Sequence, residues 1–313
     1  MKITILRLDK ADLAKADEIF RRAFAKFLGL PDPLTFTGDA AIIATRWRAN
    51  PRGALGAYSE GTLVDSSLAT RWGTFGLVGP VSVWPDLWDQ GVAKQLVAAT
   101  VALLDNWALR QSALFTFPQS PKHIALYQKF GFWPQYLTPV MSKPVRKGAS
   151  TGPWSRYSKL SSEEQSRNIS ECAALTSKVF DGLDLASEIR AIAEQHLGET
   201  ILLEDESGLA GFAVCHIGKG SEAGTGNLFV KFGVVRPDQG APARFARLLR
   251  ACESVAAEAG CQEIIAGVNT ARHQAYRHMI DRGFRTFLEG VAMLRSNEPA
   301  YNRRDCFAID DLR

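Results

Sequence analysis

Apolar residues recur every three or four positions in two long segments, the spacing that places side chains on one face of a helix. The first segment begins after Asp9, whose side chain can cap a helix, and runs to about Leu28. The second covers residues 92–109. Both stripes predict helices that pack against a core. They comprise Ile19, Phe20, Ala23, Phe24 and Phe27 in the first helix, and Val92, Leu96, Thr100, Leu103 and Trp107 in the second.

Shorter apolar runs between turn residues predict strands. In the first half of the chain these runs lie at 3–6, 54–58, 63–70, 75–83, 113–117 and 136–141, with further helices at 39–48 and 123–130. The second half repeats the order, with strands at 200–205, 211–217, 228–235, 263–268 and 291–294 and helices at 169–180, 186–195, 243–259 and 272–282. The predicted fold class is α/β (mixed α+β), with mostly antiparallel mixed sheets covered by helices on both faces.

The chain contains an internal repeat with an offset of 152 residues. The same offset, with no gap, aligns every matched residue from Val83 to Met141, so chance is a poor explanation for the matches. We therefore predict two copies of one domain, at 1–143 and 156–313, joined by a linker at 144–155 that is rich in Pro, Gly and Ser. The matched pairs are Val83 with Val235, Pro85-Asp86 with Pro237-Asp238, Leu96 with Leu248, Gly131-Phe132 with Gly283-Phe284, and Met141 with Met293.

Composition excludes several classes of protein. The 313 residues are 46% hydrophobic and 22% charged with a net charge of +4, as in an ordinary globular protein, and no basic run is interleaved with aromatics. We therefore expect no nucleic-acid partner. The N-terminus turns polar too soon for a signal peptide, and no apolar run is long enough to span a membrane. The five cysteines form no CxxC pair and the histidines no cluster, which predicts buried thiols, no metal and a cytoplasmic protein.

Two motifs stand in order between residues 85 and 132. The first is Pro85-Asp86-Leu87-Trp88-Asp89-Gln90-Gly91-Val92-Ala93-Lys94, and the second is Leu126-Tyr127-Gln128-Lys129-Phe130-Gly131-Phe132. A strand, a glycine-containing turn and a helix N-terminus together form an anion site from backbone N–H groups. This combination resembles the GNAT superfamily of acyl-coenzyme A N-acyltransferases.

The resemblance implies a fold and an activity. A GNAT-like enzyme binds acetyl-coenzyme A and transfers the acetyl group to a primary amine by direct attack. The pyrophosphate is expected on the turn formed by Trp88, Asp89, Gln90, Gly91, Val92, Ala93 and Lys94, with Trp88 replacing the family's Gln or Arg. The pantetheine arm is expected along Val81, Ser82 and Val83, as in strand addition, because Gly79-Pro80 predicts a bulge that opens the cleft. Tyr127 is the expected proton donor, and Ser120 takes the place of the family's asparagine.

The same comparison predicts that only the first half is active. With the offset of 152 residues, Trp88, Gly91 and Ala93 correspond to Gly240, Ala243 and Phe245 in the second half. Met279 stands at the position that corresponds to Tyr127. Phe245 is bulky where a phosphate should approach, and Pro242 has no N–H group to donate. We therefore expect this degenerate copy to shape the acceptor pocket and to bind coenzyme poorly or not at all.

Several questions stay open from the sequence. The general base has four candidates: Asp65, Glu60, a water, or Glu222 from the second half. An acyl-coenzyme A-binding or sensing protein without turnover, and a structural protein with a relic site, are the alternatives to an enzyme. The acceptor is a small molecule or a peptide, and the protein a monomer or a homodimer. Trp72, Phe75 and Trp133 are expected to pack in a core or interface, with an acceptor pocket as the alternative. The stretch 216–226 is expected to be a plain flexible loop, with a hairpin loop near the acceptor as the alternative, and the tail 301–313 to pack across the domains.

Overall fold

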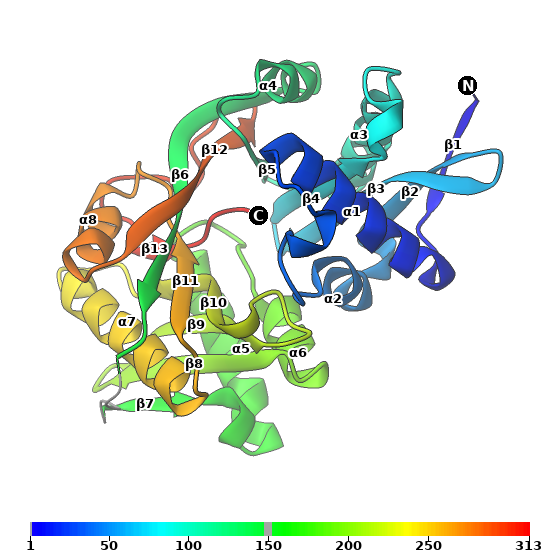
Figure 1. Ribbon diagram of the computed structural model, residues 1–313. Helices are drawn as coiled ribbons and strands as arrows, with labels where there is room; N and C mark the ends of the chain where they lie inside the picture. Colours follow the sequence, from blue (N-terminus) through cyan, green and yellow to red (C-terminus); the bar gives the residue numbers. More distant parts are fainter. Residues whose placement is uncertain (1, 147–151) are drawn as a thin grey trace.

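A computed structural model describes residues 2–146 and 152–313. The strands form one continuous 13-stranded sheet, in the order β1-β2-β3-β4-β5-β12-β6-β11-β10-β9-β8-β7, with β13 paired to β10. Helices cover both faces, and the two halves of the chain lie side by side (Figure 1). The α/β, mixed sheet predicted from the sequence is confirmed.

The first half contains the helices and strands that the hydrophobic pattern predicts. The side chain of Asp9 accepts a hydrogen bond from the N–H of Ala11, so the predicted cap forms ahead of the first helix. The elements are β1 (Ile3–Arg7), α1 (Leu13–Leu28), α2 (Ile42–Ala49), β2 (Ala54–Ser59), β3 (Thr62–Trp72), β4 (Phe75–Val83), α3 (Val92–Asn106), β5 (Gln111–Thr116), α4 (Pro121–Gln128) and β6 (Phe132–Pro144), with short 3-10 helices at Lys10–Asp12, Pro33–Thr35, Pro51–Gly53 and Pro85–Leu87.

The second half repeats this order. Phe75 of β4 pairs with Gln111 of β5, and Asn227 of β10 pairs with Glu263 of β11, so the parallel strands keep the offset of 152 residues found in the sequence. The elements are β7 (Trp154–Arg156), α5 (Ser162–Ser177), α6 (Ala186–Glu194), β8 (Gly198–Asp205), β9 (Gly208–Gly218), β10 (Gly224–Val235), α7 (Ala241–Glu258), β11 (Glu263–Gly267), α8 (His273–Asp281), β12 (Arg285–Arg295) and β13 (Ala308–Ile309), with a 3-10 helix at Tyr157–Lys159.

The last strand of each repeat is exchanged between the halves. β12 of the second half pairs with β5 of the first half, and β6 of the first half pairs with β11 of the second. β6 and β12 also pair with each other over most of their length, forming the ribbon that joins the halves in Figure 1. The predicted division at 1–143 and 156–313 follows the repeat, whereas the hydrogen-bonded sheet runs across it.

The predicted linker is partly regular structure. Pro144 ends β6, and Trp154 begins β7. The N–H of Val145 donates to the carbonyl of Gln262. Residues 147–151 of the linker lie outside the described part of the chain.

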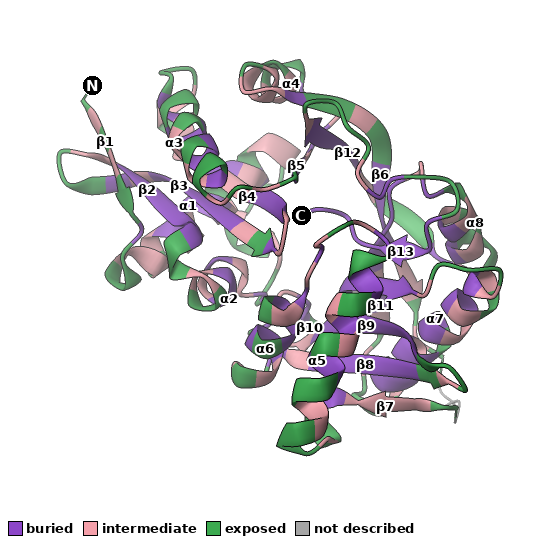
Figure 2. Ribbon diagram, turned by 180° about the vertical axis from the view of Figure 1, so that it is seen from behind, coloured by how far each residue is buried: buried purple, intermediate pink, exposed green. Residues whose placement is uncertain are grey.

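Aromatic side chains of the first half pack directly against the second half. The ring centroid of Trp72 lies 5.5 Å from that of Phe232, and that of Phe75 lies 5.3 Å from that of Tyr301. Both side chains are fully buried, whereas Trp133 is exposed. Packing at an interface is therefore confirmed for Trp72 and Phe75 and wrong for Trp133. Figure 2 shows how thoroughly the strands of the second half, such as β8 and β9, are buried.

The stretch 216–226 forms the turn between β9 and β10. It docks on the start of α2, because the carbonyl of Ser221 accepts from the N–H of Ala41 and Thr225 donates to the carboxylate of Asp39. The stretch is thus a hairpin anchored to the first half, and the expectation of a plain flexible loop is wrong.

Candidate active site

The turn before α3 presents unpaired backbone N–H groups. Gly91 is the N-cap of α3 with φ of 77°, a conformation that favours glycine. A Cβ added there would meet no atom within 4 Å, so the turn is open. In the described part of the chain, no backbone carbonyl accepts a hydrogen bond from the N–H groups of residues 91–94. Four free donors at the positive end of a 15-residue helix form a site for an anion.

The neighbouring side chains fold back and leave this turn empty. The indole N–H of Trp88 donates to the carbonyl of Val83 at 3.0 Å. Gln90 donates to the carbonyl of Asp86, and Asp89 forms an exposed ion pair with Lys122. Of the predicted side chains at this turn, Lys94 is exposed in the first turn of α3 and makes no ion pair in the described part of the chain.

Strand β4 separates from β5 where the sequence predicts a bulge. The parallel pairing ends at Val78 and Leu114. Opposite β3, the register shifts between Ala69–Val78 and Ser67–Val81, so two residues of β4, Gly79 and Pro80, stand where one would fit. The predicted bulge is confirmed.

Beyond the bulge, one edge of β4 faces no strand among the described residues. The N–H of Trp84 donates to the carbonyl of Val64 on β3. Since successive backbone groups point to opposite sides, those of Val81 and Val83 point away from β3. Both residues are partly exposed, whereas Ser82 is buried beside Ser66. The Val83 carbonyl already accepts a hydrogen bond from Trp88. The N–H of Val83 and the N–H and carbonyl of Val81 are therefore left to pair with a ligand.

The start and end of α4 hold the other two predicted residues. Ser120 is the N-cap, and its hydroxyl accepts from the N–H of His123 at 3.4 Å. Tyr127 is half-buried and belongs to the same apolar cluster as Val81. Burial raises the pKa of Tyr127, and the carboxyl of Asp65 raises it further. The phenol therefore keeps its proton at neutral pH, as a proton donor must.

The candidate bases differ in their surroundings. Glu60 is exposed at the β2–β3 turn. Burial alone would raise the pKa of Glu222, but Arg46 and Lys231 hold it well below its usual value, so Glu222 is a poor proton acceptor. Asp65 is fully buried, and neither of its oxygens has a hydrogen-bond partner in the described part of the chain. Burial raises the pKa of Asp65 well above its usual value.

The corresponding turn of the second half is closed by side chains. The N–H of Gly240 donates to the carboxylate of Asp238 at 2.7 Å, and Arg244 pairs with the same carboxylate. A Cβ added at Gly240 would lie 3.0 Å from Arg244. Phe245 is fully buried. The turn thus has internal partners where the first half has free donors.

The cleft of the second half is filled by the C-terminal tail. Ala308 and Ile309 of β13 pair with Val234 and Gly233 of β10, the residues that correspond to Ser82 and Val81. Asp310 bridges to Val268 at the end of β11. The tail therefore lies between β10 and β11, in the position where the first half leaves its cleft open.

A buried ion pair fixes the tail. Arg272, at the position that corresponds to Ser120, pairs with Asp310 at 2.9 Å, and both side chains are fully buried. Arg272 also donates to Asn302 and to the carbonyl of Ala308, while Tyr301 donates to Asp310. The sequence analysis assigned no role to these residues. Arg272 stands at the position that corresponds to Ser120, and Asp310 follows near the C-terminus. These two charged residues are the sequence signal that could have revealed the ion pair.

Comparison with known proteins places the fold. A structure from Pyrococcus horikoshii with a provisional acetyltransferase assignment superposes with a TM-score of 0.68 at 14% identity, over 99% of this chain and 95% of that chain. A GCN5-related N-acetyltransferase from Sphaerobacter thermophilus superposes with a TM-score of 0.61 at 15% identity, over 94% of this chain and 95% of that chain. A tandem GNAT protein from the clavulanic acid biosynthesis pathway superposes with a TM-score of 0.55 at 13% identity, over 95% of this chain and 99% of that chain. No curated protein matches the sequence.

These similarities define a protein with the tandem GNAT fold. The model of the Acetyltransferase (GNAT) family matches residues 16–132, which lie in the first half of the chain. No helix in residues 2–146 and 152–313 is long and apolar enough to cross a membrane. In the same residues, no group of three or more His, Cys, Asp and Glu side chains could hold a metal ion.

Proposed function

We propose that the first half binds acetyl-coenzyme A and transfers its acetyl group to a primary amine by direct attack. The observation that carries the proposal is the contrast between the halves. The first half has free N–H groups at the start of α3 and an unpaired edge on β4, whereas side chains and the tail fill both places in the second half.

The residues divide the work between binding and proton transfer. The N–H groups of residues 91–94 hold the pyrophosphate, with Lys94 close enough in sequence to add a positive charge. The backbone of Val81 and the N–H of Val83 hold the pantetheine arm as a neighbouring strand would. The amine attacks the thioester carbonyl, the carbon–sulfur bond breaks, and Tyr127 gives its proton to the leaving thiolate. The amine proton passes to a base, for which a water is the candidate, because Asp65 keeps its own proton and the carboxylate of Glu222 is already paired.

Coenzyme binding and turnover should be measured separately. Calorimetry with coenzyme A is expected to give one site per chain. Incubation with acetyl-coenzyme A and a panel of primary amines should release free thiol and add an acetyl mass to an amine. Tight binding with no product across the panel would favour a sensing protein, an alternative motivated by Trp88, which occupies the Val83 carbonyl. Failure to bind coenzyme at all would refute the proposal.

A further inference from the structure

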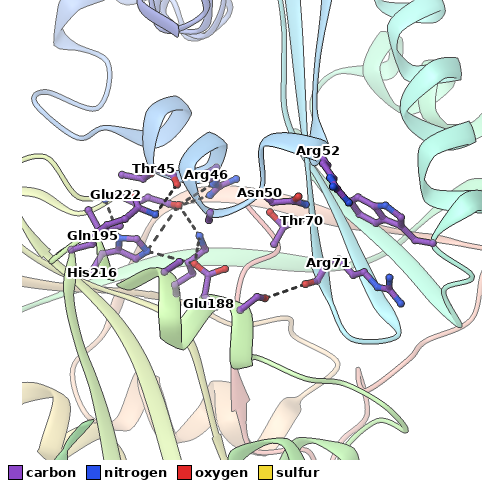
Figure 3. A pocket seen from close by; sticks show the side chains of 16 residues that line it. Thr45, Arg46, Asn50, Arg52, Thr70, Arg71, Glu188, Gln195, His216 and Glu222 are labelled. Atoms are coloured by element: carbon purple, nitrogen blue, oxygen red, sulfur yellow. Dashed lines mark hydrogen bonds and ion pairs between the residues drawn. The ribbon is translucent and has the colours of Figure 1, made fainter. Parts of the chain in front are cut away.

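A cavity of about 470 Å³ lies between the two halves. Helix α2 and strand β3 line it from the first half, and α6, β9 and β10 line it from the second. None of the residues proposed to hold coenzyme is among its lining residues. The volume falls in the range of small-molecule sites in proteins. Figure 3 shows Glu188, His216 and Glu222 grouped at one end and Arg52 and Arg71 at the other.

The inner end carries a compensated network of charges. Arg46 pairs with Glu222 at 2.6 Å, and Lys231 pairs with Glu222 at 2.7 Å and with Glu188 at 2.8 Å. All four side chains are less than a tenth exposed. Burial alone would raise the pKa of Glu188, but Lys231 lowers it below its usual value. Because each cation faces a carboxylate, this network has no charge left for a ligand.

His216 presents a buried donor that has no acceptor. Its Nδ1 accepts from the N–H of Glu222 at 3.2 Å, so the neutral ring carries its proton on Nε2. Burial lowers the pKa of His216 to about 4, which keeps the ring neutral at physiological pH. The side chain is 1% exposed, and Nε2 has no hydrogen-bond partner in the described part of the chain. The nearest carboxylate oxygens, on Glu188 and Glu222, lie 4.0 Å away, too far for a hydrogen bond.

The outer end carries positive charge without compensation. Arg52 and Arg71 are exposed lining residues, and neither makes an ion pair in residues 2–146 and 152–313. The only carboxylates in the lining, Glu188 and Glu222, are already paired at the inner end. A guanidinium group binds carboxylate and phosphate through a fork of N–H donors. The two arginines thus give this end of the cavity a preference for an anion.

We propose that this cavity binds a small organic anion, whose carboxylate or phosphate group is held by Arg52 and Arg71. The inner end accepts a polar group, because His216 offers a donor and the amide oxygen of Gln195, also unpartnered among the described residues, offers an acceptor. The site is separate from the coenzyme cleft. Arg46 connects the two, since it donates to the carbonyl of Gly79 at the bulge of β4 at 2.9 Å.

Calorimetry at constant ionic strength tests the site without any acetyl donor. The turn before α3 can also bind anions, so the cavity is reported by the binding that is lost when Arg52 and Arg71 are removed. The probes are citrate and inorganic phosphate, with chloride as the reference anion. We expect a dissociation constant in the millimolar range or below, and the probe whose binding the double variant weakens more identifies the favoured group. The double variant Arg52→Ala/Arg71→Ala should bind at least tenfold more weakly.

The matched control is Arg48→Ala, which removes an exposed arginine of α2 that does not line the cavity. It should bind as the parent protein does. The substituted arginines are exposed, so melting temperatures should stay close to the parent value and report that each variant is folded. The proposal is overturned if neither probe binds more tightly than chloride, if the double variant binds both probes as tightly as the parent, or if Arg48→Ala weakens binding as much as the double variant.

Discussion

The two halves of the chain build the same strand, turn and helix, but they treat the space between the central strands differently. Residues Gly79, Pro80, Val81 and Val83 of β4 are partly exposed, whereas their counterparts in β10 are buried. The bulge is kept in both, since the register of β10 also shifts between Val230 and Phe232. The separation of the strands is thus a property of the repeat. What differs is whether an internal segment fills it.

The comparison shows how two copies of one fold can leave the same gap between strands open in one copy and filled in the other. A splayed pair of strands exposes backbone donors and acceptors, which are costly to bury unpaired. In the second half, the tail supplies those partners from the same chain. In the first half, no described segment does so, which is the arrangement that a dissociable ligand requires. Trp72 and Phe75 of the open half pack against Phe232 and Tyr301 of the closed half.

The largest expected effect comes from removing the ion pair that fixes the tail. Arg272→Ala leaves the carboxylate of Asp310 buried without its cation. Breaking a buried pair in this way typically costs about 3 to 5 kcal/mol of unfolding free energy. Urea unfolding followed by fluorescence measures the loss. Coenzyme binding to the folded variant should persist, because the open cleft is in the other half.

The control for this variant is Arg110→Ala. Arg110 pairs with Asp181 across the halves at 2.6 Å, but the two side chains are 62% and 67% exposed. Exposed pairs contribute little to stability. If both variants lose the same unfolding free energy, the tail is held by something other than the Arg272–Asp310 pair.

The sequence alone predicted the parts of this comparison that depend on local pattern. The repeat, the helix after Gly91 and the bulge at Gly79-Pro80 follow from spacing and from residues with restricted backbones. The exchange of β6 and β12 does not, because alternation in a strand says which face is buried and leaves the neighbouring strand undetermined. The pairing of the tail with β10 was missed for a related reason, since β13 has only two residues and is defined by its partners.

The site was predictable to a similar extent. Trp88 was recognised as a departure from the family pattern, but its hydrogen bond to the Val83 carbonyl depends on the path of the turn. The arginines around the cavity come from α2 and β3 and meet side chains of the second half only after docking. Long-range contacts of this kind have no signature in a single sequence.

The next prediction concerns the proposed proton donor, because Tyr127 and Met279 occupy the same position in the two halves. Tyr127→Phe should lower kcat by about 100-fold, the usual effect of losing a general acid. The KM for acetyl-coenzyme A should change little, since the ring still packs in its cluster. The assay is thiol release under saturating amine.

Met279→Leu is the matched substitution in the second half, and it conserves volume in a buried position. It should leave kcat unchanged. A loss of activity in this variant comparable to that of Tyr127→Phe would show that the second half takes part in the chemistry.

A smaller effect is expected on coenzyme affinity at the turn. Gly91→Trp fills the open space with a bulky side chain, and coenzyme A should bind at least tenfold more weakly, about 1.4 kcal/mol. Ala243→Trp places the same side chain at the corresponding exposed position of the second half and should have no effect. Calorimetry with coenzyme A measures both.

Backbone strain needs a separate control, since Gly91 has a positive φ. Gly91→Ala adds the same strain with a small Cβ that meets no neighbour, so it should retain most of the affinity. Equal weakening by the alanine and tryptophan variants would assign the effect to the backbone, and weakening by Ala243→Trp would place the coenzyme in the wrong half for our proposal.

The smallest predicted effect concerns the buried carboxyl of Asp65, which lies opposite Val83 on β3. The second half has Gly211 opposite Val235, with no side chain at that place. Because burial raises the pKa of Asp65, the folded protein keeps this proton over a pH range in which the unfolded chain releases it. Stability is therefore lost as pH rises above about 4, the ordinary carboxyl range.

Asp65→Asn removes this titration and should make the protein more stable than the parent at pH 8. The difference should shrink as the pH falls to about 4, where the carboxyl is protonated in both states. Urea unfolding of the two proteins across this range gives the curve. A difference that does not vary with pH, or a parent protein that is the more stable one at pH 8, would mean that Asp65 is held as a carboxylate. The first half would then contain a buried carboxylate at Asp65, a place where the second half has none, and Asp65 would not carry the proton predicted from its burial.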